Sequence, residues 1–504
     1  MAEGRARAGA WGLSLLAGLA QACSMGTPWE GQPHWGLQLL ALGLLAWGIE
    51  RSAHWKQAAI AGWLFAAAWL AGTFWWLYIS MHTYGGLPAP LAVFAVFALA
   101  GALALYYAAA CALYRRYAPD ARSLRALLFA ALWLLAELAR GVWFTGFGWG
   151  GSGYAHIEGP LAGYAPWVGV YGITGIAAWL AMTMPQIWVC GHWQRIAALV
   201  VLVLPSVHQM GQPQTTTSTG TLSVALLQGN IPQDEKFQPG SGVPLALRWY
   251  GEQLLENRAP LVVAPETALP LLPRQLPEGY WAALRQRYAA GEQAALIGLP
   301  LGSLAEGYSN SAVGLAPGRE PWRYDKHHLV PFGEFIPWGF KWFTAMMNIP
   351  LGDFSRGDVG QPSFEWRGQR LAANICYEDL FGEELGARFA DPAQAPTVFV
   401  NLSNIAWFGN TVAIDQHLQI SRMRALEFER PFVRATNTGA TALIDHRGQV
   451  VAELPRHTRG VLQVEVEGRQ GLTPYARWVA HTGLWPLWAL SLAGLAWAIG
   501  RKRR

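Results

Sequence analysis

Residues 371–379 read LAANICYED, and this stretch decides how the second half of the chain is expected to fold. Its first five residues predict a buried β-strand that ends at Cys376 and passes directly into Glu378 and Asp379. A structural cysteine lies inside an apolar run more often than at its exit. Taken alone, the pattern leaves Cys376 open as either a nucleophile or a structural thiol.

Short apolar runs bounded by Gly, Pro or Asn surround this strand on both sides. They predict further strands at residues 222–227, 261–264, 295–299, 397–400, 440–444 and 462–466. Helical patterns at 244–257 and 415–429 lie between them. The mixture predicts an α/β domain over residues 221–470, which is large enough to bury its own core. The preceding stretch 211–220, GQPQTTTSTG, is expected to be a polar, flexible linker.

The first 210 residues have a different texture, dominated by long apolar runs. The whole chain is 52% hydrophobic and only 14% charged, and it contains 27 Trp. Soluble domains are about one quarter charged, and Trp gathers at membrane interfaces. Since a spanning helix needs about 20 apolar residues, we expect eight of them. Their predicted positions are 8–24, 35–50, 56–80, 88–114, 122–144, 162–190, 195–210 and 478–500.

This places a transmembrane domain at residues 1–210 and a last transmembrane helix with a basic tail at residues 471–504. The Lys and Arg residues between the apolar runs test the predicted number of transmembrane helices. Segments 25–34, 81–87 and 145–161 contain none, whereas the alternate segments carry Arg5, Arg7, Arg51, Lys56, Arg115, Arg116, Arg122, Arg125, Arg195 and the basic run 501–504. Cytoplasmic loops hold the Lys and Arg excess, so both termini are predicted to be cytoplasmic and the α/β domain to lie outside.

Charge and cysteine usage exclude two other classes of protein. The formal net charge is +5, and no basic stripe with interleaved aromatic residues is present, so no nucleic-acid partner is expected. The four cysteines form no C-x-x-C pair, so neither a metal site nor a redox motif is predicted, and no cofactor is expected. Cys23, Cys111 and Cys190 lie in apolar runs and are interpreted as small buried hydrophobic residues.

Two further segments follow predicted strands as Cys376 does. Glu266 comes just after the strand 261–264, and Lys326 lies in the segment 324–334, YDKHHLVPFGE. Considered separately, the first is a loop carboxylate and the second a charged surface turn. A thiol, however, needs a base or a cation to become a strong nucleophile. Glu266 can accept the proton and Lys326 can stabilise an oxyanion, which completes a set of groups for acyl transfer.

The Glu, Lys and Cys segments, in this order, resemble the nitrilase superfamily of carbon–nitrogen hydrolases, whose fold is an αββα sandwich. The similarity is greatest to a membrane-embedded branch, the apolipoprotein N-acyltransferase family, and it covers essentially the whole chain. The motifs that carry it are QGNIPQ at 228–233, YSNS at 308–311, KHHLVPFGE at 326–334, CYE at 376–378, QHLQ through RMRALE at 416–427, TGF at 145–147 and GVYG at 169–172.

The resemblance implies that Glu266 is the general base, Lys326 the oxyanion stabiliser and Cys376 the nucleophile. Supporting positions in the active site are implied for Asn310, Glu334, Tyr377 and Glu378. Glu334 is expected to pair with Lys326 and, with Glu266, to keep it charged. Candidates for substrate binding are Phe237, Trp407, Phe408, Arg140 and Tyr154.

Three positions depart from the family pattern. Ile405 stands where the family usually has Asp, Gly148 replaces a Pro, and Phe237 replaces a frequent Trp. None of them belongs to the Glu–Lys–Cys set, so they bear on substrate handling rather than on formation of the acyl-enzyme.

By this resemblance the substrates are a phospholipid acyl donor, expected to be phosphatidylethanolamine, and a diacylglyceryl apolipoprotein acceptor. The location implied is the bacterial inner membrane, with the catalytic domain on the periplasmic side of the lipid bilayer. The aromatic segments 335–343 and 406–408 are either a water-excluding surface near the bilayer or ordinary core. Glu137 and Arg140 are either an ion pair inside the bundle or, for Arg140, a contact to a lipid phosphate.

Two other functions remain open from the sequence. The same three residues serve an amidase or nitrilase tethered to the membrane and acting on a small C–N substrate. A non-enzymatic transporter or scaffold with an inactive outer domain is the second, although the intact Glu–Lys–Cys set argues against it.

Overall fold

The computed structural model describes residues 2–187, 191–211, 215–344 and 353–503. The chain divides into two compact units. The helical unit comprises Met1–Tyr78, Ala89–Pro213 and Thr482–Arg504, and the α/β unit comprises Ile79–Pro88 and Gln214–His481. The ten residues 79–88 therefore belong to the α/β unit, although the chain on both sides of them is helical and apolar. Cys190 lies outside the described residues.

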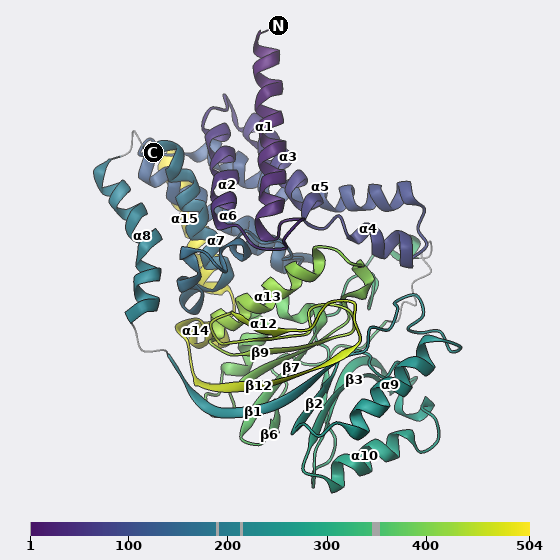
Figure 1. Ribbon diagram of the computed structural model, residues 1–504. Helices are drawn as coiled ribbons and strands as arrows, with labels where there is room; N and C mark the ends of the chain where they lie inside the picture. Colours follow the sequence, from purple (N-terminus) through teal and green to yellow (C-terminus); the bar gives the residue numbers. More distant parts are fainter. Residues whose placement is uncertain (1, 188–190, 212–214, 345–352, 504) are drawn as a thin grey trace. The chain divides into compact units, whose positions relative to one another are not determined.

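The helical unit is built from the long apolar runs of the sequence (Figure 1). Its helices are α1 (Ala2–Met25), α2 (Trp35–Glu50), α3 (Trp55–Thr73), α4 (Leu77–Ile79, at the boundary of the unit), α5 (Ala89–Tyr117), α6 (Arg122–Val142), α7 (Ala165–Thr183), α8 (His192–Gly211) and α15 (Trp485–Arg503), with short turns η2 (Trp143–Thr145), η3 (Ser152–His156), η4 (Pro160–Tyr164) and η5 (Met184–Gln186). Each apolar run predicted to span a membrane is helical over most of its described length.

Length and composition select fewer spans than the eight expected. Within the described ranges, three stretches are long and apolar enough to cross a membrane: Ala89–Tyr117, Arg122–Thr145 and Pro160–Gln186. Two bent pairs, Trp55–Thr73 with Leu77–Tyr84 and Pro474–Thr482 with Trp485–Lys502, raise the number to five if each forms one span. Helix α2 has only 16 residues and so extends about 24 Å, short of a hydrocarbon core of about 30 Å. Several apolar helices are thus present, but eight spans are not confirmed.

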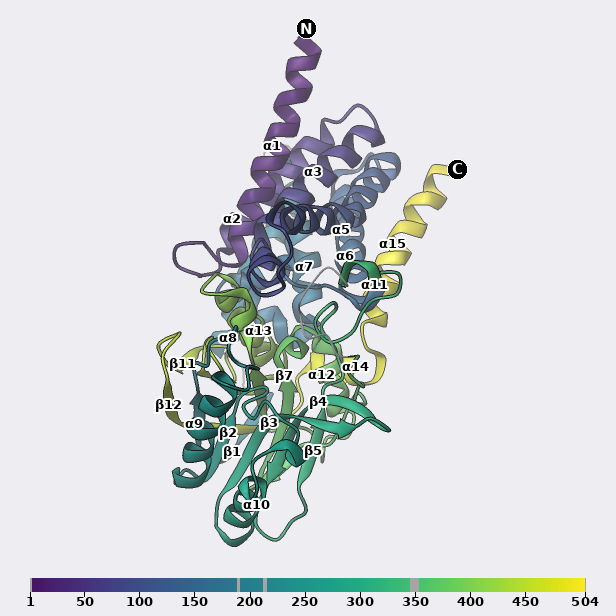
Figure 2. The ribbon, with the colours of Figure 1, turned by 90° about the vertical axis from the view of Figure 1, so that its right-hand side faces the viewer.

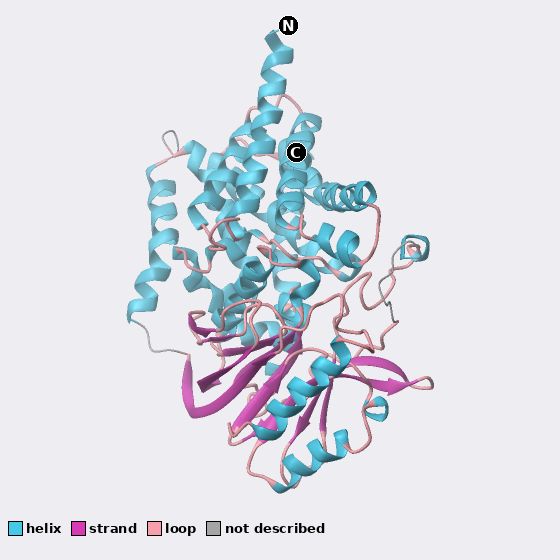
Figure 3. Cartoon of the chain, turned by 45° about the vertical axis from the view of Figure 1, so that its right-hand side comes forward, coloured by secondary structure: helices cyan, strands magenta, loops and turns pink. Residues whose placement is uncertain are grey.

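The α/β unit contains two six-stranded sheets, drawn as magenta arrows in Figure 3. The strand order is β12-β1-β2-β3-β4-β5 in the first sheet and β11-β10-β9-β8-β7-β6 in the second. The strands are β1 (Thr216–Gln228), β2 (Leu261–Ala264), β3 (Ala294–Ser303), β4 (Gly307–Leu315), β5 (Trp322–Asp325), β6 (Phe364–Trp366), β7 (Gln369–Ile375), β8 (Val398–Ser403), β9 (Phe432–Thr436), β10 (Ala442–Ile444), β11 (Val450–Glu453) and β12 (Gly460–Gly471).

One prediction about the domain boundary is wrong in detail. Residues 216–220 were assigned to the linker because they are polar, but they form the start of β1 and pair with the end of β12. Thr217 lies opposite Gln470, and Ser218 lies opposite Arg469. Threonine favours extended backbone because of its branched β-carbon, and an edge pairing does not need an apolar face.

The α/β unit also contains helices, some on the outer faces of its sheets and others in the connecting loops. They are α9 (Gly242–Glu256), α10 (Tyr280–Ala290), α11 (Lys341–Thr344), α12 (Gly382–Gly386), α13 (Ala413–Phe428) and α14 (Pro474–Thr482), with short turns η1 (Ser80–Tyr84), η6 (Pro273–Gln275), η7 (Cys376–Leu380), η8 (Ala387–Phe389) and η9 (Ile405–Phe408). Helices α9 and α10 lie beside the first sheet (Figure 2), and the ring of Phe428 at the end of α13 packs on Phe399 of the second.

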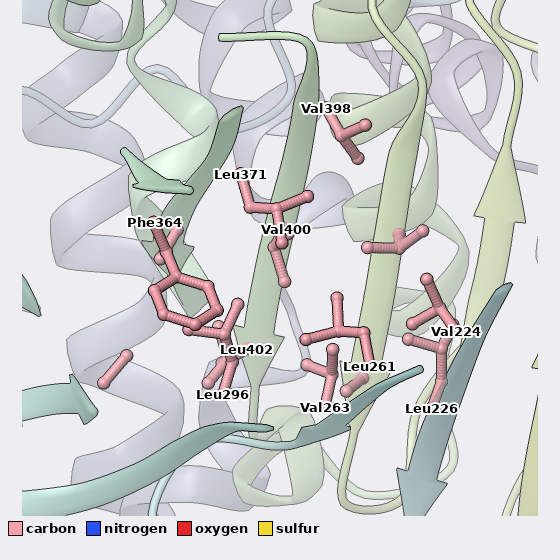
Figure 4. Close-up of a cluster of buried hydrophobic side chains, with 14 of the residues drawn as sticks. Val224, Leu226, Leu261, Val263, Leu296, Phe364, Leu371, Val398, Val400 and Leu402 are labelled. Atoms are coloured by element: carbon pink, nitrogen blue, oxygen red, sulfur yellow. The ribbon is translucent and has the colours of Figure 1, made fainter. Parts of the chain in front are cut away.

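The main core lies between the two sheets. Along β1, Val224 and Leu226 face the second sheet, whereas the alternate residues Ala225 and Leu227 pack with α9 and α10. In Figure 4, Val263 of β2 lies in the same cluster as Val400 of β8. The layers are therefore helix, sheet, sheet and helix, as the resemblance implied.

The strand ends bring chemistry-bearing residues to one edge of this sandwich. β1, β2 and β3 run parallel in the first sheet, and β7, β8 and β9 run parallel in the second. Glu266 follows the carboxyl end of β2, Cys376 follows β7, and Asn404 follows β8. Carboxyl ends of parallel strands meet at the same edge of a sheet, which is where ligands bind in open α/β folds.

Candidate active site

Cys376 occupies a strained position directly after β7. Its φ angle is +52°, in the left-handed region that residues with a β-carbon seldom adopt. Such a conformation costs about 1–3 kcal/mol and persists only where the surroundings hold it. The turn η7 begins at this residue, so the strained backbone places the side chain at the exit of the strand rather than inside the sheet.

The thiol of Cys376 is surrounded by charged and polar groups of the same unit. Burial and the negative charge of Glu266 raise its pKa to about 12, although the positive charge of Lys326 opposes the shift. At neutral pH the thiol therefore keeps its proton. A base must remove that proton during the attack, because the thiolate is the nucleophilic form.

Glu266 is buried and fixed at both carboxylate oxygens. Oε1 accepts a hydrogen bond of 2.7 Å from Nδ2 of Asn310, and Oε2 accepts one of 2.8 Å from the backbone N–H of Asn404. Asn404 belongs to the segment that follows β8, on the second sheet. The carboxylate that follows β2 is thus held by one residue from each sheet.

Lys326 follows β5 and is buried, with only 1% of its side chain exposed. Its Nζ donates to Oε1 of Glu334 at 2.9 Å and lies 3.5 Å from Oε1 of Glu266. Burial alone would lower the pKa of Lys326, but the charges of Glu334 and Glu266 outweigh burial and raise it above its usual value. The ammonium group therefore stays charged, as a group that stabilises an oxyanion must.

Asn310 on β4 links the two carboxylates. Its Nδ2 donates to Glu266 at 2.7 Å and to Glu334 at 2.8 Å, while Oε2 of Glu334 accepts from the backbone N–H of Val330 at 2.8 Å. The four side chains are therefore locked into one arrangement by charge and by hydrogen bonds. We call this group the carboxylate–lysine network: Glu266, Asn310, Lys326 and Glu334.

Glu378 does not contact Lys326 directly and ties together the segments that carry the lysine and the cysteine. Its Oε1 accepts from the backbone N–H groups of His327 at 2.7 Å and His328 at 3.2 Å. Oε2 accepts from the N–H of Ile375 at 2.6 Å. The neighbouring Tyr377 is buried, with its ring against those of His328 and Phe381.

Three of the candidates for substrate binding lie in the α/β unit. Phe237 is 41% exposed, and Trp407 and Phe408 of η9 are half-buried. The ring of Tyr84, from the segment 79–88, meets Trp407 edge-on at 5.9 Å between centroids. Apolar surface is therefore available on the loop after β1, which carries Phe237, and on the segment that continues from Asn404.

The aromatic segment after Glu334 is not ordinary core. Trp338 is 98% exposed, and Phe340 and Trp342 are exposed as well. Exposed aromatic residues in one short segment mark a contact surface rather than a packed interior. The structure thus excludes the core interpretation for these three residues.

Arg140 and Tyr154 lie in the helical unit. Arg140 forms an ion pair of 2.9 Å with Glu137, and its guanidinium also donates to Tyr107 and to two backbone carbonyls. Tyr154, in η3, is buried. The ion-pair interpretation of Arg140 therefore agrees with the structure, and its donors are already engaged.

Lys236 is a site residue that the sequence analysis missed. It is buried to 1% exposure, and its Nζ donates to the backbone carbonyl of Glu266 at 3.1 Å. Burial lowers the pKa of Lys236 to about 8, although the charges of Glu266 and Cys376 oppose the shift. The lysine stands beside Phe237 in a short loop, and the only sequence signal for it was its place in the segment after the motif at 228–233.

The arrangement suits covalent acyl transfer. A protonated thiol, a fixed carboxylate and a charged lysine converge in the α/β unit. They can supply a nucleophile, a proton acceptor and stabilisation of a negatively charged tetrahedral intermediate.

Comparison with known proteins agrees with this chemistry. Residues 13–183 match the apolipoprotein N-acyltransferase N-terminal domain, and residues 223–475 match the carbon-nitrogen hydrolase family. The apolipoprotein N-acyltransferase of Verminephrobacter eiseniae is 61% identical, with 98% of this chain and 97% of that protein covered. The chain belongs to the apolipoprotein N-acyltransferase family. It is therefore an acyltransferase, with the nitrilase-like domain of that family.

Other relatives of the family are also similar along almost the whole chain. The apolipoprotein N-acyltransferase of Ralstonia nicotianae is 46% identical, covering 93% of this chain and 90% of its own length. That of Bordetella bronchiseptica is 41% identical, with 97% of each chain covered. Among solved structures, a carbon-nitrogen hydrolase from Helicobacter pylori is 17% identical over 54% of this chain and 95% of its own, with a TM-score of 0.36.

Proposed function

We propose that this protein transfers a fatty acyl chain from a membrane phospholipid to the α-amino group of the N-terminal diacylglyceryl-cysteine of apolipoproteins, the last step of bacterial lipoprotein maturation. Cys376 carries the acyl group between the two substrates as a thioester. The observation that carries the proposal is the convergence of the Cys376 thiol with the carboxylate–lysine network. The family membership of the chain supports the lipoprotein acceptor.

In the first half-reaction, the sulfur of Cys376 attacks the ester carbonyl of a phospholipid. Glu266 accepts the thiol proton, and Lys326 stabilises the oxyanion of the tetrahedral intermediate. The bond between the carbonyl carbon and the glycerol oxygen then breaks. The proton held by Glu266 passes to that oxygen, and a lysophospholipid leaves.

In the second half-reaction, the α-amino group of the lipoprotein attacks the thioester. Glu266 takes a proton from the amine and returns it to the leaving sulfur, so the amide forms and the thiol is restored. Two products leave in turn, which makes the reaction ping-pong. Water must be excluded while the thioester waits, and the exposed aromatic residues Trp338, Phe340 and Trp342 support such a shield against a lipid surface.

The membrane arrangement proposed for the chain follows from its loops. Eight spans would place both termini in the cytoplasm and the α/β unit on the periplasmic side of the bacterial inner membrane. The transmembrane domain would cover residues 1–210, the catalytic domain 216–470, beginning with β1, and the last helix with its basic tail 471–504. Support comes from the alternation of segments that carry Lys and Arg with segments that lack them, and from the apolar helices. Phosphatidylethanolamine is the proposed acyl donor.

The test uses the purified full-length protein and phosphatidylethanolamine with a labelled acyl chain. Mass spectrometry of the intact protein should detect one labelled acyl group, which digestion assigns to Cys376. Addition of a diacylglyceryl lipopeptide should release it as an amide, whereas a matched lipopeptide with an acetylated α-amino group should not. Rapid hydrolysis of small amides without labelling from phospholipid would instead establish an amidase and overturn the proposal.

A further inference from the structure

The backbone carbonyl of Cys376 is held by two buried side chains that the proposed reaction does not use. Nδ2 of Asn401, on β8, donates to this oxygen at 3.1 Å, and Nε2 of His417, on α13, lies 3.2 Å from it. Asn401 is itself fixed, because Nδ2 also donates to Oδ1 of Asn374 at 2.7 Å. The backbone of Cys376 is strained, because its φ is +52°. The two hydrogen bonds to its carbonyl hold it in that conformation.

The neighbours of His417 decide which ring nitrogen carries its proton. An Nη2 group of Arg434 lies 3.0 Å from Nδ1 of His417, and a guanidinium can only donate. Nδ1 must therefore accept, which leaves the imidazole proton on Nε2. The Nε2–H group faces the carbonyl of Cys376 and Oδ1 of Asp379, the latter at 3.0 Å.

Asp379 is itself held in place by Arg434 and Ser421. Its Oδ2 accepts from Arg434 at 3.1 Å and from the hydroxyl of Ser421 at 2.5 Å. Burial would raise the pKa of Asp379, but its contacts with His417 and Arg434 outweigh burial and hold it below the usual value. His417 and Ser421 are four residues apart on α13 and so lie on one face of the helix. We call this group the Cys376 clamp: Asp379, Asn401, His417, Ser421 and Arg434.

We propose that His417, oriented by Asp379 and Arg434, is a positioning residue that holds the peptide after Cys376 so that the thiol stays beside the carboxylate–lysine network. The inference rests on the proposed function, in which Cys376 is the nucleophile. A peptide is planar, so fixing the carbonyl of Cys376 also fixes the direction of the N–H group of Tyr377. Without the clamp, the backbone relaxes toward common φ values and the thiol moves. A displacement of about 1 Å can slow a reaction about 10²-fold.

The test measures how fast Cys376 acquires an acyl group from phospholipid in the full-length protein, per folded molecule. His417→Leu removes the donor, and His417→Gln keeps an amide N–H close to the position of Nε2. We expect His417→Leu to acylate about 10²-fold more slowly than the wild type and His417→Gln to recover to within about tenfold. If His417 only stabilised the fold, His417→Gln would not restore the rate relative to His417→Leu. The rate is expressed per folded molecule, so a loss of stability alone does not change it.

Thr473→Ala is the matched control for lost stability. The hydroxyl of Thr473 donates to the carbonyl of Glu427 near the end of α13 at 2.7 Å, and it touches neither Cys376 nor the clamp. We expect it to lower the unfolding temperature while the acylation rate per folded molecule stays within about twofold. If His417→Leu does not fold, Asn401→Ala carries the test, with an expected slowing of about tenfold.

Two results would overturn the inference. In the first, His417→Leu, or Asn401→Ala where it replaces His417→Leu, is acylated as fast as the wild type. In the second, His417→Gln is acylated as slowly as His417→Leu. Cys376→Ala separates this failure from failure of the proposed function. If Cys376→Ala still forms a thioester with the labelled acyl chain, the proposed nucleophile is wrong. If labelling disappears in Cys376→Ala but is unchanged in His417→Leu, only the positioning role is wrong.

Discussion

The carboxylate–lysine network and the Cys376 clamp hold the same reaction centre in different ways. The network places charges at the ends of side chains, and each charge is fixed by another side chain or by a backbone N–H. The clamp acts on a backbone carbonyl and presents no group to a substrate. The difference teaches that the two can be separated by experiment. Neutral substitutions of the same shape should disable the network without moving it, whereas the clamp should respond to geometry rather than charge.

The largest effect should come from Glu266→Gln, which keeps the shape of the side chain and removes the base. We expect acylation of Cys376 to slow about 10³-fold, within the usual contribution of a general base. The measurement is the rate of acyl-enzyme formation by intact-protein mass spectrometry. The exposed Glu278, changed to Gln, is the control and should match the wild type. A rate for Glu266→Gln within tenfold of the wild type would mean that another group accepts the proton.

Lys326→Met should follow, with acylation slowed about 10²-fold, because it removes the cation beside the forming oxyanion. It also leaves Glu266 and Glu334 buried close together without a counter-charge. We therefore expect the unfolding temperature to fall too. Lys326→Met with Glu334→Gln should recover stability and not rate. Recovery of both would contradict an electrostatic role for Lys326.

Glu378→Gln tests the connection between the two regions, with an expected slowing of about tenfold. Both carboxylate oxygens of Glu378 accept backbone N–H groups, and a Gln amide would turn an NH₂ group toward one of those donors. The lysine segment should then separate from the turn of Cys376. The effect should be on kcat rather than on KM for phospholipid. A change confined to KM would place Glu378 in substrate binding instead.

A fourth prediction concerns the thiol itself. With a pKa of about 12, Cys376 should be ionised to only about one part in a thousand at pH 9, where an ordinary thiol with a pKa of 9.0 is half ionised. The measurement is the ultraviolet absorbance of thiolate in wild type minus Cys376→Ser. In Glu266→Gln the thiolate fraction should rise, because a negative charge is lost, even as acylation slows. A fall in both would contradict the assignment of Glu266 as base.

The smallest effect expected is on stability, from Lys236→Met. The pKa of Lys236 is lowered to about 8 from 10.5, so between these values the unfolded chain binds more protons and wild-type stability rises with pH. Below about pH 8 the buried Lys236 is charged in the folded protein, and the desolvation of this charge lowers the free energy of unfolding. Lys236→Met should therefore unfold at a higher temperature near pH 7, and the gain should shrink toward pH 10. Lys341→Met, at an exposed lysine, should show neither change.

Part of this site could be predicted from the sequence because some of its residues directly follow single strands that are recognisable on their own. Glu266 and Cys376 come directly after apolar runs whose strand assignment needs no knowledge of partners. The strand β2 was predicted with its observed limits. The strand β4 was missed, since GYSNSAVGL lacks an apolar run at its start, and yet it carries Asn310, which links both carboxylates.

The rest depends on contacts between distant parts of the chain. His417 meets the carbonyl of a residue 41 positions earlier, and Lys236 meets that of a residue 30 positions later. No local pattern encodes such pairs, although the motif at 416–427 marked the right helix. The predicted number of membrane spans stays unconfirmed for a related reason. Apolar runs could be counted from the sequence. The sequence did not show that α3 ends at Thr73 or that the chain bends after it.

The retained proton on Cys376 has a consequence for the lifetime of the protein. Peroxides and disulfides react with thiolates far faster than with thiols, and the first oxidation product of a nucleophilic cysteine is no longer a nucleophile. A sulfur that gives up its proton only when Glu266 removes it is therefore slow to oxidise between turnovers. In an oxidising compartment, the burial that delays its ionisation would also preserve it.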